Sequence, residues 1–200
     1  MNIPNKLTIS RVLMAALLVL LLTTPFRFSY TLALLTFSLA AITDALDGHL
    51  ARNVYGVTDF GKLMDPLADK IMIAAAFVCF VGIRLPTQTT GLVPAWMVVL
   101  ILSREFLVTG LRLLAAGKGQ VISAGNWGKH KTTWQIIVII AILLFLAVRN
   151  DFIPTDAAYI ERFDRILDLG SYFASLGVAV LTLVSGVVYF RKHSDLIADD

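Results

Sequence analysis

The stretch Thr43–Lys70, TDALDGHLARNVYGVTDFGKLMDPLADK, concentrates acidic side chains in an otherwise apolar chain. The first 150 residues contain six acids, and four of them are Asp44, Asp47, Asp65 and Asp69 of this stretch. Asp44 and Asp47 are three residues apart and therefore share one face of a predicted helix. Asp65 and Asp69 are four residues apart on the next predicted helix and also share a face. Because the connection is short, we expect the two helices to be antiparallel neighbours between which the four carboxylates converge.

The composition indicates an all-α integral membrane protein. Of the 200 residues, 58% are hydrophobic and 16% are charged, whereas soluble domains average about 45–50% apolar and about 25% charged residues. A membrane helix needs about 20 predominantly apolar residues. The sequence predicts six transmembrane helices in a single membrane-embedded domain of residues 1–200, at 8–25, 31–52, 62–83, 92–116, 131–149 and 170–190.

Other general features exclude several classes of protein. The single cysteine, Cys79, lies in an apolar run, so the chain has no intrachain disulfide framework. The net charge of +3 is small and scattered, and nucleic acid is not an expected partner. No small-residue cleavage site follows the first apolar run, so we expect the first span to be retained.

The distribution of lysine and arginine predicts the orientation in the membrane, because cytoplasmic loops are enriched in these residues. If the N-terminus is cytoplasmic, that side receives Lys6, Arg52, Lys62, Lys118, Lys129, Lys131, Arg191 and Lys192. The opposite side receives Arg27, Arg84, Arg149, Arg162 and Arg165. The bias favours cytoplasmic placement of both termini.

The segment 154–170, PTDAAYIERFDRILDLG, precedes the sixth predicted span. Its apolar residues Tyr159, Phe163, Ile166 and Leu167 recur at helical spacing among charged residues. This pattern predicts a short helix lying in the outer membrane interface. A solvated loop is an equally good interpretation of the same residues.

The four aspartates predict a site for divalent metal ions. Carboxylates brought together disfavour one another's ionisation unless cations compensate them. Oxygen ligands without cysteine or clustered histidine suit Mg²⁺ or Mn²⁺ rather than zinc. Two such ions would bind a diphosphate and the charge that develops in phosphoryl transfer, and an aspartate not fully used by metal would serve as general base. The alternative is salt bridging to Arg52, Lys62 and Lys70, although acids within a membrane are costly and usually functional.

The pattern Asp44-x2-Asp47-Gly48-x2-Ala51-Arg52-x8-Gly61-x3-Asp65-x3-Asp69 resembles, position for position, the signature of the CDP-alcohol phosphotransferase family. The resemblance implies a six-helix membrane enzyme, usually a homodimer, in which a hydroxyl of one alcohol displaces CMP from a CDP-activated second alcohol. It implies two metal ions bound by Asp44, Asp47 and Asp65, with Asp69 as the base and a further metal ligand. It also implies a cytidine pocket at Gly48, Ala51 and Gly61, and a nucleotide phosphate contact at Arg52.

Three further segments resemble the phosphatidylglycerophosphate synthases of bacteria. The opening NIPNKLTISR would place Asn5, Thr8 and Arg11 on one side of the first helix start, beside the CDP pyrophosphate. A helix cap together with an interfacial arginine, Arg11, is the alternative interpretation. SREFLVTGLR and NWGKHKTTWQ would supply a basic pocket for the acceptor's phosphate, formed by Arg104, Arg112, Lys129 and Lys131. For the lysines the alternative is anchoring at the cytoplasmic surface, and for Arg104 it is a buried structural pair with Glu105.

This resemblance implies a reaction between CDP-diacylglycerol and glycerol 3-phosphate that yields phosphatidylglycerophosphate and CMP. The enzyme would lie among the lipids of the bacterial inner membrane with its active site facing the cytoplasm. A cardiolipin synthase or an inositol-phosphate transferase would use the same donor, and only the resemblance of the three segments selects glycerol 3-phosphate. A transporter would also bind cations at buried acids, but the chain lacks the internal repeats common in transporters. A membrane scaffold would leave the intramembrane charges unexplained.

Overall fold

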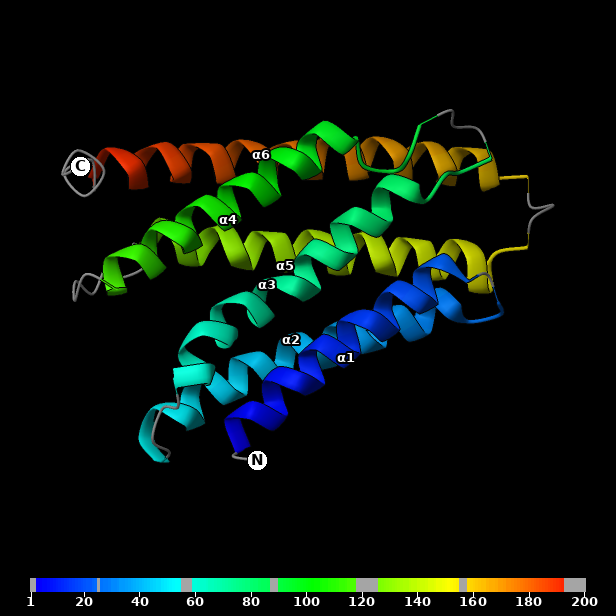
Figure 1. Cartoon of the computed structure of the whole chain (residues 1–200). Helices are drawn as coiled ribbons and strands as arrows, with labels where there is room; N and C mark the ends of the chain where they lie inside the picture. Colours follow the sequence, from blue (N-terminus) through cyan, green and yellow to red (C-terminus); the bar gives the residue numbers. More distant parts are fainter. Residues whose placement is uncertain are drawn as a thin grey trace.

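The structure of the chain is a computed structural model whose described part is drawn in colour in Figure 1. Its backbone is described for residues 3–24, 26–54, 59–86, 90–117, 126–154 and 158–192. Its side chains are described for residues 9–24, 26–43, 70–86, 90–117, 131–154 and 158–192.

The regular secondary structure of the described part is all helical, and these residues contain no β-strand. It consists of α1 (Ile3–Thr23), α2 (Ser29–Val54), α3 (Asp59–Gly82), α4 (Ala95–Gly117), α5 (Asn126–Ala147), the π-helical segment η1 (Val148–Phe152) and α6 (Ile160–Lys192). Each of the six apolar segments of the sequence therefore corresponds to one α-helix. The all-α prediction is confirmed.

The helices run up and down and alternate in direction, so that both chain ends lie at one end of the bundle (Figure 1). The same end holds the last turns of α2 and α4 and the first turns of α3 and α5. In the described part, α1 packs against α2 and α3, α5 packs against α2 and α6, and α4 packs against α6. The structure thus places α1 in contact with both of the helices that carry the aspartates.

A core of apolar side chains fills the middle of the bundle. Phe77 and Phe80 of α3 are fully buried, with ring centroids 6.2 Å apart in an edge-to-face arrangement. Leu18 of α1, Ile101 of α4 and Leu143 of α5 are fully buried as well. Burying a side chain of this kind stabilises a fold by about 1.5–3 kcal/mol when the alternative is water.

The prediction that residues 160–170 are helical is confirmed, so the alternative of a loop is wrong there, but the expectation of a short, separate helix is also wrong. The placement of this stretch in the outer membrane interface stays a prediction. This stretch forms the first turns of α6, which continues without interruption to Lys192. The continuity has a physical cause in Asp164, which is buried against Arg149 of η1. The guanidinium donates to both carboxylate oxygens, with Nε–Oδ1 at 2.9 Å and Nη2–Oδ2 at 3.1 Å. Because the charge of Arg149 balances that of Asp164, this charged stretch of α6 can pack against the rest of the bundle.

Asp151 makes a second polar connection at this end of the bundle. Its Oδ2 accepts hydrogen bonds from the Thr31 backbone N–H at 2.8 Å and from the Thr31 hydroxyl at 2.6 Å. Thr31 lies in the first turn of α2, where a carboxylate is favoured by the unsatisfied N–H groups of the helix. The segment η1 therefore ties the start of α2 and the start of α6 to the end of α5.

Two helices of the described part are long and apolar enough to cross a membrane, at Lys131–Phe152 and Ile160–Lys192. Three shorter apolar helices lie at Ile9–Thr23, Ser29–Thr43 and Lys70–Gly82. These lengths are consistent with a membrane protein, and the full set of six spans stays a prediction.

Replacing Asp164 with asparagine should destabilise the fold strongly, because Arg149 would remain buried without its counter-ion. Breaking a buried ion pair from one side costs about 3–5 kcal/mol, which lowers Tm by roughly 10 °C in a chain of this size. Thermal unfolding in detergent measures the change. Glu161→Gln is the matched control, because Glu161 is an exposed acid of the same helix and its loss should leave Tm almost unchanged.

Candidate active site

The helix segments that carry the predicted site residues meet at one end of the bundle (Figure 1). The last turns of α2 contain the first two aspartates, and the first turns of α3 contain the other two. Both segments are helical, so the spacings of three and four residues place each pair on one helix face. The side chains of many predicted site residues lie outside the described part, namely those of Asn5, Thr8, Asp44, Asp47, Gly48, Ala51, Arg52, Gly61, Asp65, Asp69 and Lys129.

The best-described polar group of this site is the buried carboxylate of Glu105 in α4. Three cationic side chains, one from each of three helices, form ion pairs with it. Lys131 of α5 donates to Oε1, Arg104 of α4 places Nη1 3.6 Å from the same oxygen, and Lys70 of α3 places Nζ 3.3 Å from Oε2. The side chain of Glu105 is 8% exposed and that of Lys131 is 3% exposed, so most of this cluster is removed from solvent.

Lys70 is held by several groups of α4 at once. Besides the Glu105 carboxylate, its Nζ donates to the Glu105 backbone carbonyl at 3.3 Å and to the hydroxyl of Thr109. The Thr109 hydroxyl in turn donates to the Glu105 carbonyl at 2.7 Å. Lys70 directly follows the last aspartate of the pattern, so these contacts attach the aspartate-bearing part of α3 to α4.

Arg104 is positioned by α6 rather than by its neighbour in the sequence. Its Nη2 donates to the Ser185 hydroxyl at 2.6 Å, which is closer than its 3.6 Å approach to Glu105. Gly186 makes room for the stem of the arginine, because a Cβ atom on this glycine would lie 2.9 Å from the Arg104 Cγ. The predicted alternative of a simple Arg104–Glu105 pair is therefore incomplete, since Glu105 also binds Lys70 and Lys131.

The other predicted basic residue of α4, Arg112, is exposed two turns beyond Arg104. Arg104 and Arg112 are eight residues apart on α4, so they lie on nearly the same face of this helix. The structure thus brings Arg104 and Lys131 together, and Arg112 follows on the same side of α4.

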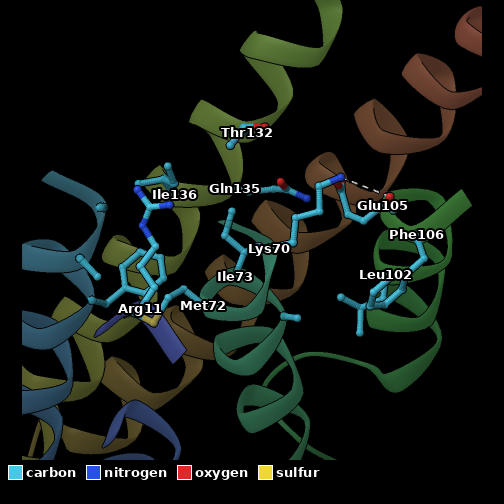
Figure 2. Close-up of a pocket in the computed structure, with 14 residues that line it drawn as sticks. Arg11, Lys70, Met72, Ile73, Leu102, Glu105, Phe106, Thr132, Gln135 and Ile136 are labelled. Atoms are coloured by element: carbon cyan, nitrogen blue, oxygen red, sulfur yellow. Dashed lines mark hydrogen bonds and ion pairs between the residues drawn. The ribbon is translucent and has the colours of Figure 1, made fainter. Parts of the chain in front are cut away.

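A cavity of about 220 Å³ lies beside this cluster, between α1, α2, α3, α4 and α5. Among the described residues, its polar lining consists of Arg11, Lys70, Glu105, Thr132 and Gln135. The other described residues of the lining are apolar and include Phe37, Met72 and Leu102. Figure 2 shows the Gln135 side chain of α5 extending toward Lys70 of α3, whose side chain extends toward Glu105. The cavity therefore combines an apolar wall with a cationic edge.

Gln135 is the most deeply buried polar residue among the described members of this lining. It is 1% exposed, and its amide Nε2 has no hydrogen-bond partner among the described residues. It lies one turn after Lys131 on α5, so the two side chains share a face. A buried amide donor beside a cation cluster suits a ligand that accepts hydrogen bonds.

Sequence reasoning did not assign Lys70 to the site, because its position after Asp69 fits an interfacial lysine equally well. It also treated Glu105 only as a partner for Arg104. The signal that would have identified both residues is the presence of an acid and a lysine within apolar spans, where such groups seldom lack partners.

The predicted metal site rests on residues whose side chains are outside the described part. Among the described residues, no three histidine, cysteine, aspartate or glutamate side chains lie close enough to hold an ion together. The chemistry of the predicted ligands still fits a hard divalent cation, because all four are carboxylates on segments that meet at one end of the bundle.

Comparison with known proteins agrees with the resemblance in the sequence. The family model described as CDP-alcohol phosphatidyltransferase matches residues 1–188. A Bacillus subtilis protein named CDP-diacylglycerol–glycerol-3-phosphate 3-phosphatidyltransferase is 36% identical over 204 residues, which cover 96% of this chain and 95% of the relative. Proteins of the same name are 38% identical in Pseudomonas fluorescens, over 72% of each chain, and 33% identical in Haemophilus influenzae, over 100% of this chain and 97% of the relative.

Two glycines of α6 should respond in opposite ways to replacement by alanine. Gly177 has nothing within 4 Å of an added Cβ, so Gly177→Ala should stabilise the helix by about 0.5–1 kcal/mol. At Gly186 the added methyl group would displace the stem of Arg104, and overpacking of this kind costs about 1–3 kcal/mol. Thermal unfolding of the two variants in detergent should place Gly186→Ala below the unchanged protein and Gly177→Ala at or above it. A Gly186→Ala protein as stable as Gly177→Ala would contradict the described contact.

Proposed function

Because this chain belongs to the CDP-alcohol phosphatidyltransferase family, we propose that it transfers the phosphatidyl group of CDP-diacylglycerol to glycerol 3-phosphate. The products are phosphatidylglycerophosphate and CMP, and the role is phospholipid biosynthesis. The relatives that cover nearly the whole chain carry the name of this reaction. The structural observation that supports it best is the cluster of Lys70, Arg104 and Lys131 at the end of the bundle where the aspartate-bearing segments meet.

The acceptor's phosphate is assigned to the basic residues of α4 and α5. Arg104, Arg112, Lys129 and Lys131 bind this group, and a guanidinium offers a phosphate two parallel hydrogen bonds. Binding the phosphate fixes the distance from it to the primary hydroxyl of the glycerol. Holding a hydroxyl in the attacking orientation accounts for a large part of the rate gain in such reactions.

The donor is assigned to the first three helices. Asn5 and Thr8 of α1 contact the pyrophosphate, Gly48, Ala51 and Gly61 leave space for the cytidine, and Arg52 binds a nucleotide phosphate. The acyl chains remain among the apolar faces of the bundle. Small residues permit the close approach that a flat base needs.

The chemistry uses the four aspartates in two roles. Asp44, Asp47 and Asp65, with a contribution from Asp69, would hold two divalent ions, Mg²⁺ or Mn²⁺, which supply charge compensation for a diphosphate. Asp69 accepts the proton of the acceptor hydroxyl as that oxygen attacks the β-phosphorus. The bond from this phosphorus to the CMP oxygen breaks, and CMP leaves.

The placement of the enzyme follows from the same assignments. All six helices span the bacterial inner membrane as one domain of residues 1–200, and the chain forms a homodimer. Both termini face the cytoplasm, where CDP and glycerol 3-phosphate are soluble groups. The site end of the bundle therefore faces the cytoplasm too.

Purified protein should release CMP from CDP-diacylglycerol when glycerol 3-phosphate is added. Phosphatidylglycerol and inositol phosphate serve as competing acceptors in the same assay. Each should give a lower rate than glycerol 3-phosphate, because the relatives that cover nearly the whole chain are named for glycerol 3-phosphate. A higher rate with either of these acceptors would assign the enzyme to a different branch of the family.

Asp69→Asn should abolish turnover while CDP-diacylglycerol still binds, because the amide is similar in shape but cannot accept the hydroxyl proton. Loss of a general base lowers rates by about 10²–10⁴-fold. CMP release and binding of the donor are measured on the same preparation. Asp168→Asn is the control, because Asp168 belongs to the first turns of α6, and the start of α6 lies at the opposite end of the bundle (Figure 1). Normal turnover by Asp69→Asn would show that another group takes the proton.

Removal of divalent ions with EDTA should stop CMP release. Addition of Mg²⁺ or Mn²⁺ in excess should restore it, whereas Ca²⁺ should restore less, because its larger radius and irregular coordination suit the site poorly. Full activity of metal-free protein would contradict the assignment of the aspartates as ligands.

A further inference from the structure

Glu105 lies where three helices bring their cations together, although no assignment above gives it a role in the reaction. Both of its carboxylate oxygens are occupied, Oε1 by Lys131 and Arg104 and Oε2 by Lys70. A carboxylate with two occupied oxygens has little capacity left to bind a metal ion or to take a proton. Its position instead determines where the cations of α3, α4 and α5 lie relative to one another.

We infer that Glu105 is a positioning residue for the acceptor's phosphate, because it holds Lys70 and Lys131 at the spacing in which they receive an anion together with Arg104. This inference rests on the proposed function. The three cations share one carboxylate and would otherwise repel one another. An ammonium group has three N–H donors and a guanidinium has five, so Lys131 and Arg104 keep donors for a ligand beyond their contacts with Glu105 and Ser185, while Lys70 adds its positive charge.

Each of the three cations is also fixed by a second feature of the fold. The Thr109 hydroxyl and the Glu105 carbonyl accept hydrogen bonds from Lys70. The Ser185 hydroxyl accepts a hydrogen bond from Arg104. Lys131 of α5 is almost fully buried. The flexible stems of lysine and arginine are therefore restricted before any substrate arrives. Ordering such side chains beforehand removes a cost that binding would otherwise carry.

Two buried donors close to the cluster point to a ligand that accepts hydrogen bonds. Among the described residues, neither the Gln135 Nε2 nor the Arg104 Nε has a partner. Gln135 lines the cavity together with Glu105 and Lys70, as Figure 2 shows. A phosphate carries several acceptor oxygens, and it would match donors arranged in this way.

The test compares Glu105→Gln with the unchanged enzyme. The amide keeps the size of the side chain but removes the negative charge, so the cations should separate. The KM for glycerol 3-phosphate should rise about tenfold or more, in line with the loss of a charged hydrogen bond. The KM for CDP-diacylglycerol should change by less than about threefold, because the donor binds elsewhere. Glu105→Asp keeps the charge on a shorter side chain and should give an intermediate KM.

Asp164→Asn is the matched control, because it removes a different buried carboxylate from its arginine at the opposite end of the bundle. It should lower Tm without changing the ratio of the two KM values. A role of Glu105 in stability alone would make Glu105→Gln behave in the same way as this control. That result, or a fall in the KM for glycerol 3-phosphate, would overturn the inference.

A second measurement does not depend on turnover. Inorganic phosphate should raise the Tm of the unchanged protein and should do so much less for Glu105→Gln or Glu105→Asp. If the protein lacks activity with glycerol 3-phosphate but phosphate binding depends on Glu105, the proposed function fails and the anion site stands. If the enzyme is active but phosphate protects the Glu105 variants equally, the positioning role is wrong.

Thr109→Val tests the same point if both Glu105 variants fail to fold. This change removes one hydrogen-bond acceptor of Lys70, so phosphate should raise the Tm of the variant less than it raises the Tm of the unchanged protein.

Discussion

The constraint on which this structure depends is that a charge within an apolar bundle must have a counter-ion. Like charges about 4 Å apart repel by about 4 kcal/mol at an effective dielectric constant of about 20. Lys70, Arg104 and Lys131 can approach one another only because the Glu105 carboxylate lies between them. This one acid therefore links α3, α4 and α5 in a chain that belongs to the CDP-alcohol phosphatidyltransferase family.

The same constraint operates at the opposite end with a different result. Arg149 and Asp164 form a pair with two hydrogen bonds and no cation left over, and Asp151 is bonded to the first turn of α2. Each of these three charged side chains is hydrogen-bonded within the fold, so the contacts fix the positions of the helix ends. At the Glu105 cluster, one carboxylate instead contacts cations of three helices.

Much of the fold could be predicted from the sequence, because long apolar runs interrupted by Gly, Pro and charged residues mark helices directly. The stretch Thr43–Lys70 also identified the family, since its spacing is a property of the chain itself. The start of α6 was predicted wrongly, because its charged residues resemble an interfacial segment until Asp164 is seen against Arg149. The role of Lys70 was missed for a related reason, since its partners lie 35 and 39 residues away in α4.

By itself, the sequence determined which residues share a helix face, because the period of 3.6 residues fixes the relation between positions within one helix. It thereby determined the two acidic pairs and the family. Only the tertiary structure decided which faces meet, and so it alone brought Lys70, Lys131 and Arg104 to Glu105 and seated Arg104 against Ser185 and Gly186. The physical reason is that the crossing of two helices depends on the fit of all the side chains between them, which no local spacing specifies.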